Sequence, residues 1–242
     1  MNIQEKLTTI AENVTKVYEA GVAEGRVQQA NDFMESFQQG GKRTDYSYAF
    51  ANWGEVNNPS LIYDVVVSGA YSASSMFYHS GIPDIVKWLG NKRIDISRAT
   101  SISNMCQAAK SISLPPFDMS NVINATLAFY NISNVNKLTL LNVNPNCVWD
   151  RTFNYSKFVE LEITGTIGKT ISFGSNYYLN KESIINIMNC LSTETSGVPI
   201  TISKTAVDKA FATTEGGTDG STSAEWEALC NTRTNWTITL QG

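Results

Sequence analysis

The sequence predicts an α+β protein in three parts: an N-terminal α-helix, a β-solenoid built from a repeated segment, and a C-terminal cap of helices and strands. Two observations carry this prediction. A thirteen-residue pattern recurs four times in the middle of the chain, and an apolar stripe runs through the first seventeen residues. With 242 residues, of which 42% are hydrophobic, the chain is large enough to bury a core.

The first segment, 1–41, is expected to be an α-helix that ends at Gly40 and Gly41. Its apolar residues alternate between steps of four and three, as on the contact seam of a short coiled coil: Ile3, Leu7, Ile10, Val14 and Val17. So narrow a stripe needs a partner, either the rest of the chain or other copies of the helix. We favour self-association into a homo-oligomer, with the helix also serving as an anchor. Residues 42–62 follow as a connector and N-terminal cap.

The internal repeat occupies 63–176. Its four copies are Val65–Phe77, Ile94–Cys106, Phe117–Phe129 and Leu141–Phe153, which start 29, 23 and 24 residues apart (94−65, 117−94, 141−117). These intervals lie at or near the period of about 20 to 29 residues that is typical of leucine-rich repeats. The repeat therefore predicts a leucine-rich-repeat-like solenoid, in which each coil buries its apolar edge against its neighbours.

Within each copy, the first and third residues are apolar, which predicts the inward face of a short strand. These pairs are Val65/Val67, Ile94/Ile96, Phe117/Met119 and Leu141/Val143. The closing residues are expected to line up as the core ladder of the solenoid: Phe77, Cys106, Phe129 and Phe153. A second apolar group follows each copy, such as Ile112 and Leu114 after the second.

Residues 177–242 are predicted to form the C-terminal cap that closes the stack. Asn180 is a candidate N-cap for a helix through Ile184 and Leu191, and Ser223 is a candidate N-cap for a helix from Ala224 to about Asn231. A helical turn is expected over 207–211. Alternating apolar residues predict two strands, over 198–202 and 236–240.

Two of the copies resemble a known family. The runs Ile94–Ser97 and Phe117–Val122 are similar to the BspA-like repeats of bacterial surface proteins, which read apolar-Asp-x-Ser-Asn-Val and end in a Met-Phe pair. In the fourth copy, Asn142 and Pro145 depart from that pattern. The wider layout, with an Arg-Thr-Asp-Tyr-x-Tyr-Ala-Phe segment at 43–50, resembles virion proteins of phages and prophages of gut Firmicutes. That resemblance implies a fibre, spike or decoration on a head or tail.

Composition excludes several classes. The net charge is −4 with no basic stripe, so nucleic acid is not an expected partner. No apolar run has the length of a membrane span or the features of a signal peptide, so we expect synthesis in the bacterial cytoplasm and no membrane contact. The four cysteines form no Cys-x-x-Cys pair and are expected to be free, buried thiols: Cys106, Cys147, Cys190 and Cys230.

No motif for catalysis stands out. His79 is the only histidine and is expected to lie in an ordinary turn. The Gly-Lys-Thr of 168–170 lacks the glycine spacing of a phosphate loop, and a turn is expected there. Glu160 and Glu162 alternate with apolar residues, which predicts that both lie on the solvent face of one strand. We therefore expect no catalytic residue, no metal, no cofactor and no enzymatic activity.

The expected function is that of a non-enzymatic phage structural protein in the virion. Its N-terminal helix would anchor it, and its repeats would contact the host surface, through a glycan or a protein, or the particle itself. Expected partners are further copies of the chain and other virion proteins. The alternative is an adhesin or protein-interaction module of the same repeat family on a bacterial cell surface.

Overall fold

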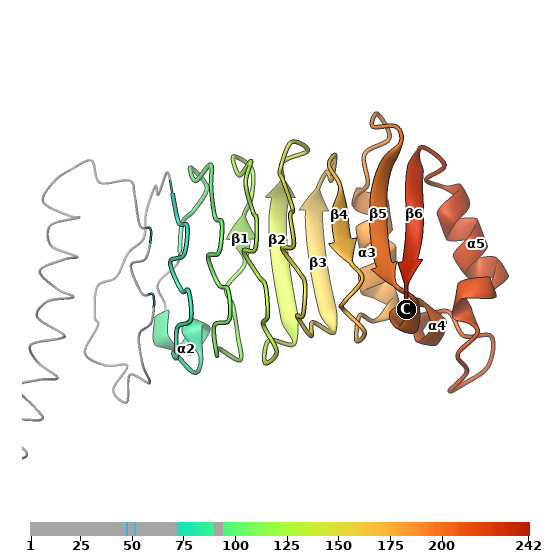
Figure 1. Ribbon diagram of the computed structural model, residues 1–242, viewed down its shortest axis with the longest axis horizontal. Helices are drawn as coiled ribbons and strands as arrows, with labels where there is room; N and C mark the ends of the chain where they lie inside the picture. The colour runs from blue at the N-terminus through green and yellow to red at the C-terminus, as the bar shows by residue number, and fades with distance from the viewer. Residues whose placement is uncertain (1–46, 48–50, 52–71, 90–93) are drawn as a thin grey trace, which may run out of the picture. The chain divides into compact units, whose positions relative to one another are not determined.

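The computed structural model describes residues 47, 51, 72–89 and 94–242, which belong to one compact unit (Figure 1). The predicted N-terminal helix over 1–41 lies outside the described residues, and so does nearly all of the predicted connector over 42–62. Val65 and Val67 of the first repeat copy lie outside them as well.

Four segments of eight residues lie side by side in the first half of the described chain, and we call them rows. They are 72–79, 101–108, 124–131 and 148–155. Isolated parallel bridges join their first residues in order, Ser72 to Ser101, Ser101 to Asn124 and Asn124 to Val148. Rows that are 23 to 29 residues apart in the sequence are therefore neighbours in space (101−72, 124−101, 148−124).

Backbone hydrogen bonds alternate along each of the first three rows between the row itself and the next one. In the second row, the N–H of Cys106 donates to the carbonyl of Ala128 in the third row at 2.8 Å. The preceding N–H, of Met105, instead donates within its own row to the carbonyl of Ile102 at 3.0 Å. This division gives a partner to the N–H groups from the second to the eighth residue of the first three rows, which a buried backbone requires.

Each row contains two residues in the left-handed region, at its fourth and eighth positions. Their φ angles lie between 50° and 60°, and they are Ser75, His79, Asn104, Ala108, Leu127, Asn131, Arg151 and Tyr155. Left-handed residues reverse the direction of the backbone, so each row is a succession of turns and not a β-strand. The second, fifth and sixth side chains of every row point into the core and are at most 3% exposed.

The regular elements form two three-stranded parallel sheets and four α-helices within the described residues. The first sheet has the order β1 (Phe117–Asp118), β2 (Lys137–Val143) and β3 (Glu160–Gly165). The second has the order β4 (Ile171–Phe173), β5 (Val198–Ser203) and β6 (Trp236–Gln241). The helices are α2 (Ile85–Leu89), α3 (Lys181–Cys190), α4 (Lys204–Ala210) and α5 (Ala224–Asn231), with a 3₁₀ turn at Gly220–Thr222.

The predicted leucine-rich-repeat-like β-solenoid with a helix–strand cap is wrong. The chain is an α+β mixture, but its strands belong to two separate small sheets, and β3 and β4 do not pair. The first sheet stops at β3 because side chains of α3 occupy the place of the next strand. Ser183 Oγ accepts a hydrogen bond from the N–H of Leu161 at 2.8 Å. Asn186 binds both backbone groups of Ile163, at 2.7 Å to its N–H and 3.0 Å to its carbonyl.

Two predicted core positions also differ. Leu141 is only half-buried, and Leu140 points inward instead, because the pairing of β2 with β3 shifts between Leu140 and Val143. Asn142, between them, adopts a φ of 54°, which turns the strand at this irregularity. Ile112 is 60% exposed, whereas Leu114 is buried.

The polar residues of the Asp-x-Ser-Asn pattern make contacts within a repeat copy and between successive copies. Asp95 Oδ1 accepts from the N–H of Ser97, and Asp118 Oδ1 accepts from the N–H of Ser120, at 2.9 and 3.0 Å. Asn121 Nδ2 then donates to the carbonyl of Ser97, 24 residues earlier, at 2.6 Å. The pattern thus shapes a turn and ties it to the preceding one.

The elements of the C-terminal part follow the prediction more closely. Asn180 caps α3, with its side chain accepting from the N–H of Ser183, and Ser223 caps α5. β5 and β6 cover the two predicted strands, and α4 is longer than the single turn expected over 207–211. Figure 1 shows α3 and α4 behind the second sheet.

The α3 contact with β3 predicts the effect of one substitution. Asn186→Ala removes the side-chain partner of the Ile163 N–H and one of two partners of the Ile163 carbonyl, which keeps its bond from Cys190 Sγ at 3.2 Å. We therefore expect the free energy of unfolding to fall by about 1–3 kcal/mol. Urea denaturation followed by circular dichroism measures this loss. Asn189→Ala, at an exposed position of the same helix, is the control and should change stability little. Equal stability of the two variants would contradict the edge contact.

Candidate functional site

The exposed side chains of the four rows form one surface, which we call the turn face. It carries the first, third, fourth, seventh and eighth side chains of each row, except Ser75 in the first row, which is buried; the other three side chains of each row point into the core. The backbone beneath it is fixed by hydrogen bonds from row to row. The turn face is therefore a set of side chains held at regular positions on a rigid support.

One side of the turn face is lined by hydroxyl groups. The first and third residues of the first two rows are serines, and their hydroxyls bind one another across the rows. Ser74 Oγ lies 2.9 Å from Ser101 Oγ, and Ser103 Oγ donates to Ser74 Oγ at 3.2 Å. Asn124 and Thr126 occupy the same two positions in the third row.

The other side, which we call the aromatic edge, consists of the seventh and eighth residues of each row: 78–79, 107–108, 130–131 and 154–155. The rings of Tyr78 and His79 have centroids 4.3 Å apart in the first row. Tyr130 of the third row meets Tyr155 of the fourth edge-on, with centroids 5.4 Å apart. Tyr155 is 63% exposed, so its ring is available to a partner.

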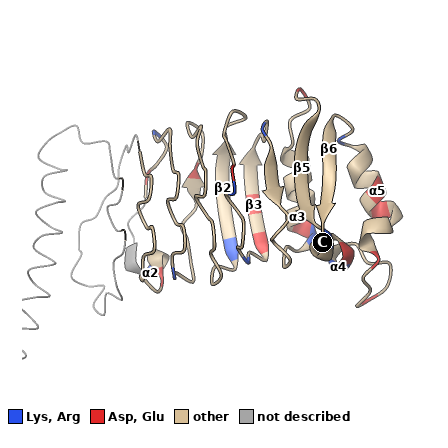
Figure 2. Cartoon of the chain, viewed as in Figure 1, with Lys and Arg blue, Asp and Glu red and all other residues tan. Residues whose placement is uncertain are grey.

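Charge is scarce on the turn face. Apart from His79, Asp150 and Arg151 are the only acidic or basic residues in the four rows, and they pair with each other at 3.3 Å. Most of the rows are therefore tan in Figure 2. Tyrosine, serine and asparagine together, with little charge, are the side chains that recur in antibody binding surfaces.

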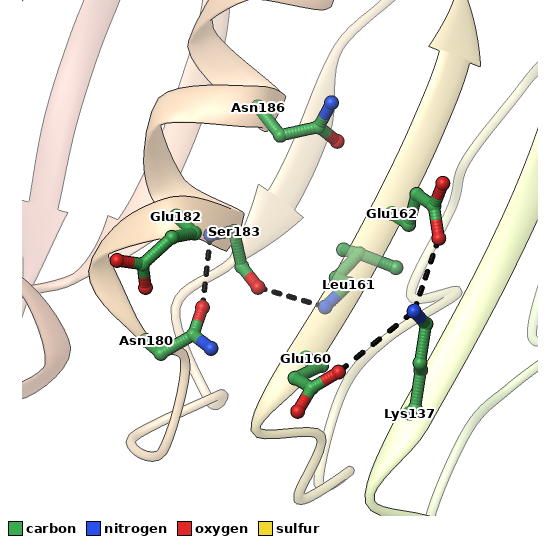
Figure 3. A pocket seen from close by; sticks show the side chains of 8 residues that line it. All are labelled: Lys137, Glu160, Leu161, Glu162, Asn180, Glu182, Ser183 and Asn186. Carbon is green, nitrogen blue, oxygen red and sulfur yellow. Dashed lines mark hydrogen bonds and ion pairs between the residues drawn. The ribbon is translucent and has the colours of Figure 1, made fainter.

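A second feature is a groove of about 410 Å³ between β2, β3 and α3 (Figure 3). Lys137 Nζ lies 3.1 Å from Glu162 and 3.8 Å from Glu160, and all three side chains are about half exposed. Both glutamates project from the same face of β3, as predicted, and Lys137 offsets their repulsion. The deeper polar groups, on Ser183 and Asn186, are already bound to β3. The groove therefore lies where α3 binds the edge of β3, and its deeper polar groups serve that contact.

The predicted core ladder is buried throughout. Phe77, Cys106, Phe129 and Phe153 are each 0% exposed and lie at the sixth position of successive rows. The rings of Phe129 and Phe153 stack with centroids 6.0 Å apart, and Phe153 stacks on Phe173 of β4 at 4.8 Å. Phe173 extends the line into the second sheet, which the repeat pattern did not indicate.

The candidate oligomerisation residues, Ile3, Leu7, Ile10, Val14 and Val17, all lie outside the described residues. His79 is exposed and adopts the left-handed conformation at the end of its row, a turn position as predicted. Among the described residues, no three side chains of the kinds that bind metals gather together. None of the helices in the described part is long and apolar enough to cross a bilayer.

The Gly-Lys-Thr segment leads from β3 to β4. Gly165 has a φ of 94°, and a Cβ there would lie 2.3 Å from the backbone nitrogen of Val143. A Cβ on Gly168 would lie 2.5 Å from the carbonyl oxygen of Pro145. Both glycines thus allow close approach of neighbouring backbone, and the glycine requirement is one of packing.

The sequence alone did not show the turn face. Its left-handed positions are occupied mostly by residues other than glycine or asparagine, including Leu127, Arg151 and Tyr155, so composition gives no turn signal there. The recurrence of tyrosines one or two residues after the ladder residues, at Tyr78, Tyr130 and Tyr155, was the one sign of it in the sequence.

The left-handed conformation predicts that two substitutions of Asn131 differ in their effect on stability. This residue is exposed with a φ of 55°, a conformation that asparagine tolerates and β-branched side chains do not. Asn131→Val should lower the free energy of unfolding by about 1–2 kcal/mol, whereas Asn131→Gly should change it by less than about 1 kcal/mol. Thermal or urea unfolding compares the two variants. Similar stability for both would show that the left-handed turn does not form.

The thiols are expected to react at different rates. Burial raises the pKa of Cys147 to about 12 and raises the pKa of Cys106 even further above its ordinary value. Cys190 and Cys230 are only half-buried, and the pKa of each is raised less. A raised pKa lowers the thiolate fraction at pH 8, so alkylation of native protein followed by mass spectrometry should label Cys190 and Cys230 first. Early labelling of Cys106 would contradict the buried ladder.

Comparison with known proteins gives no match to a family model, a curated protein or a solved structure. The likeness of Phe117–Val122 to BspA-like repeats therefore stays a resemblance between short segments, and it assigns the chain to no family.

Proposed function

We propose that this chain is a non-enzymatic structural protein of a phage virion, a fibre, spike or decoration on head or tail. The N-terminal segment anchors it, through contacts with other copies of the chain and with other virion proteins. The turn face is displayed outward and contacts the host surface or a neighbouring part of the particle. The observation that carries the proposal is the turn face itself, with its aromatic edge.

The ordered backbone beneath the turn face supports a role in binding. Each row binds the next through backbone hydrogen bonds and packs its second, fifth and sixth side chains into one core. Binding to such a support avoids the entropic cost of ordering a loop, because the backbone is already ordered. Tyr155 and its neighbours are therefore preorganised for recognition, and tyrosine is enriched at protein interaction surfaces.

The resemblance of the wider layout, with its segment at 43–50, to phage and prophage proteins supports a virion as the place of display. A bacterial surface adhesin or protein-interaction module would use the same turn face, so the two assignments differ in location and not in the binding surface. An experiment on location separates them.

The location is tested on intact particles and on the bacteria that produce them. We expect antibodies raised against the full chain to label purified virions by immunogold electron microscopy, and mass spectrometry of those virions to find its peptides. Particles from a phage whose gene for the chain is interrupted serve as the control and should not be labelled. Absence from purified virions, with label on the bacterial surface instead, would replace the proposal with the adhesin.

A further inference from the structure

We propose that the aromatic edge of the turn face binds a neutral polysaccharide, whose chain lies across the four rows. This inference rests on the proposed function, since it names the class of ligand that the displayed surface recognises.

The aromatic edge is continuous from the first row to the fourth. Its backbone is tied from row to row by hydrogen bonds of 2.9 Å, from His79 to Gln107, from Ala108 to Tyr130 and from Asn131 to Asn154. Neighbouring rows in parallel pairing lie about 4.8 Å apart, so the four rows span about 14 Å. That length accommodates a short stretch of a linear sugar chain.

Aromatic rings stand at both ends of this edge, with small or polar residues between them. The Tyr78–His79 pair occupies the first row, and the Tyr130–Tyr155 pair occupies the third and fourth. The second row carries Gln107 and Ala108 at the same positions. The edge therefore offers two aromatic surfaces, which are separated by the smaller side chains of Gln107 and Ala108.

Tyr155 is the residue that its surroundings explain least. It is 63% exposed, so its ring contributes little to the core, and its φ of 60° is a conformation that bulky side chains disfavour. Its equivalents in the other rows are His79, Ala108 and Asn131. The left-handed conformation therefore belongs to the turn that every row repeats, and the bulk and exposure of its ring are what set Tyr155 apart.

The chemistry of the turn face selects a neutral, hydroxyl-rich ligand. A sugar ring has an apolar C–H face, which packs on aromatic rings, and a rim of hydroxyls, which bind amides and other hydroxyls. The aromatic edge supplies rings together with the amides of Gln107, Asn131 and Asn154, and the serines supply hydroxyls on the other side of the turn face. An anionic polymer would call for basic side chains, but Arg151 is paired with Asp150. A protein partner would call for a larger apolar centre than one exposed ring pair provides.

Affinity electrophoresis of the full chain tests the proposal, in gels that contain dextran, mannan, galactan or hyaluronate. We expect at least one of the three neutral polysaccharides to retard the protein, and the anionic hyaluronate not to. Tyr155→Ala should weaken the interaction by about tenfold or more, because it removes the most exposed ring of the edge. Tyr155→Phe, which keeps the ring, should retain most of the binding.

Ile112→Ala is the matched control, since Ile112 is 60% exposed and lies outside the rows. It should bind like the unaltered chain, and circular dichroism should show that every variant is folded. Retardation by none of the neutral polysaccharides, retardation by hyaluronate alone, or equal binding by Tyr155→Ala and Ile112→Ala would each overturn the inference. Virion labelling without polysaccharide binding would leave the proposed function standing, whereas binding without virion labelling would remove the virion assignment alone.

Discussion

The structure of the first half of the described chain depends on one constraint: in each of the first three rows, every second N–H needs a carbonyl in the next row. Because the left-handed residues turn the backbone twice in each row, these N–H groups cannot all be satisfied locally. A single row is therefore unstable by itself, and stability arises only when rows lie together. The same arrangement aligns the sixth side chains, so the stacking of Phe129 on Phe153 follows from the hydrogen bonding.

The sheets and helices that follow the rows must also give each buried backbone N–H a partner, and at one strand edge that partner is a side chain. At β3, the outward N–H groups of Leu161 and Ile163 meet polar side chains of a helix instead of another strand. Ser183 and Asn186 are spaced by three residues, so they lie on one side of α3 and reach successive outward groups of the strand. A helix can thus end a parallel sheet without leaving its edge unpaired. This contact separates the two sheets and positions the groove around Lys137.

Much of the arrangement could be predicted from the sequence, because it depends on apolar spacing and on caps. The intervals of 29, 23 and 24 residues indicated which segments would be neighbours, and the closing residues of the copies are buried together. Asn180 and Ser223 marked the starts of α3 and α5. The prediction of a β-solenoid was wrong because apolar residues at every second position occur both in a strand and in a succession of turns, so the pattern does not distinguish them. The displacement of Leu141 by Leu140, and the contact of Asn186 with β3, depend on pairing register and tertiary contacts that no local pattern encodes.

The separation between backbone support and exposed side chains has a consequence for how this surface changes. The bonds that hold Tyr78, Gln107, Tyr130 and Asn154 in place come from main-chain atoms, which every residue type except proline supplies. Substitution at these positions alters what the surface presents while the scaffold beneath stays the same. Selection can therefore vary recognition quickly, one residue at a time, without a matching adjustment in the protein interior.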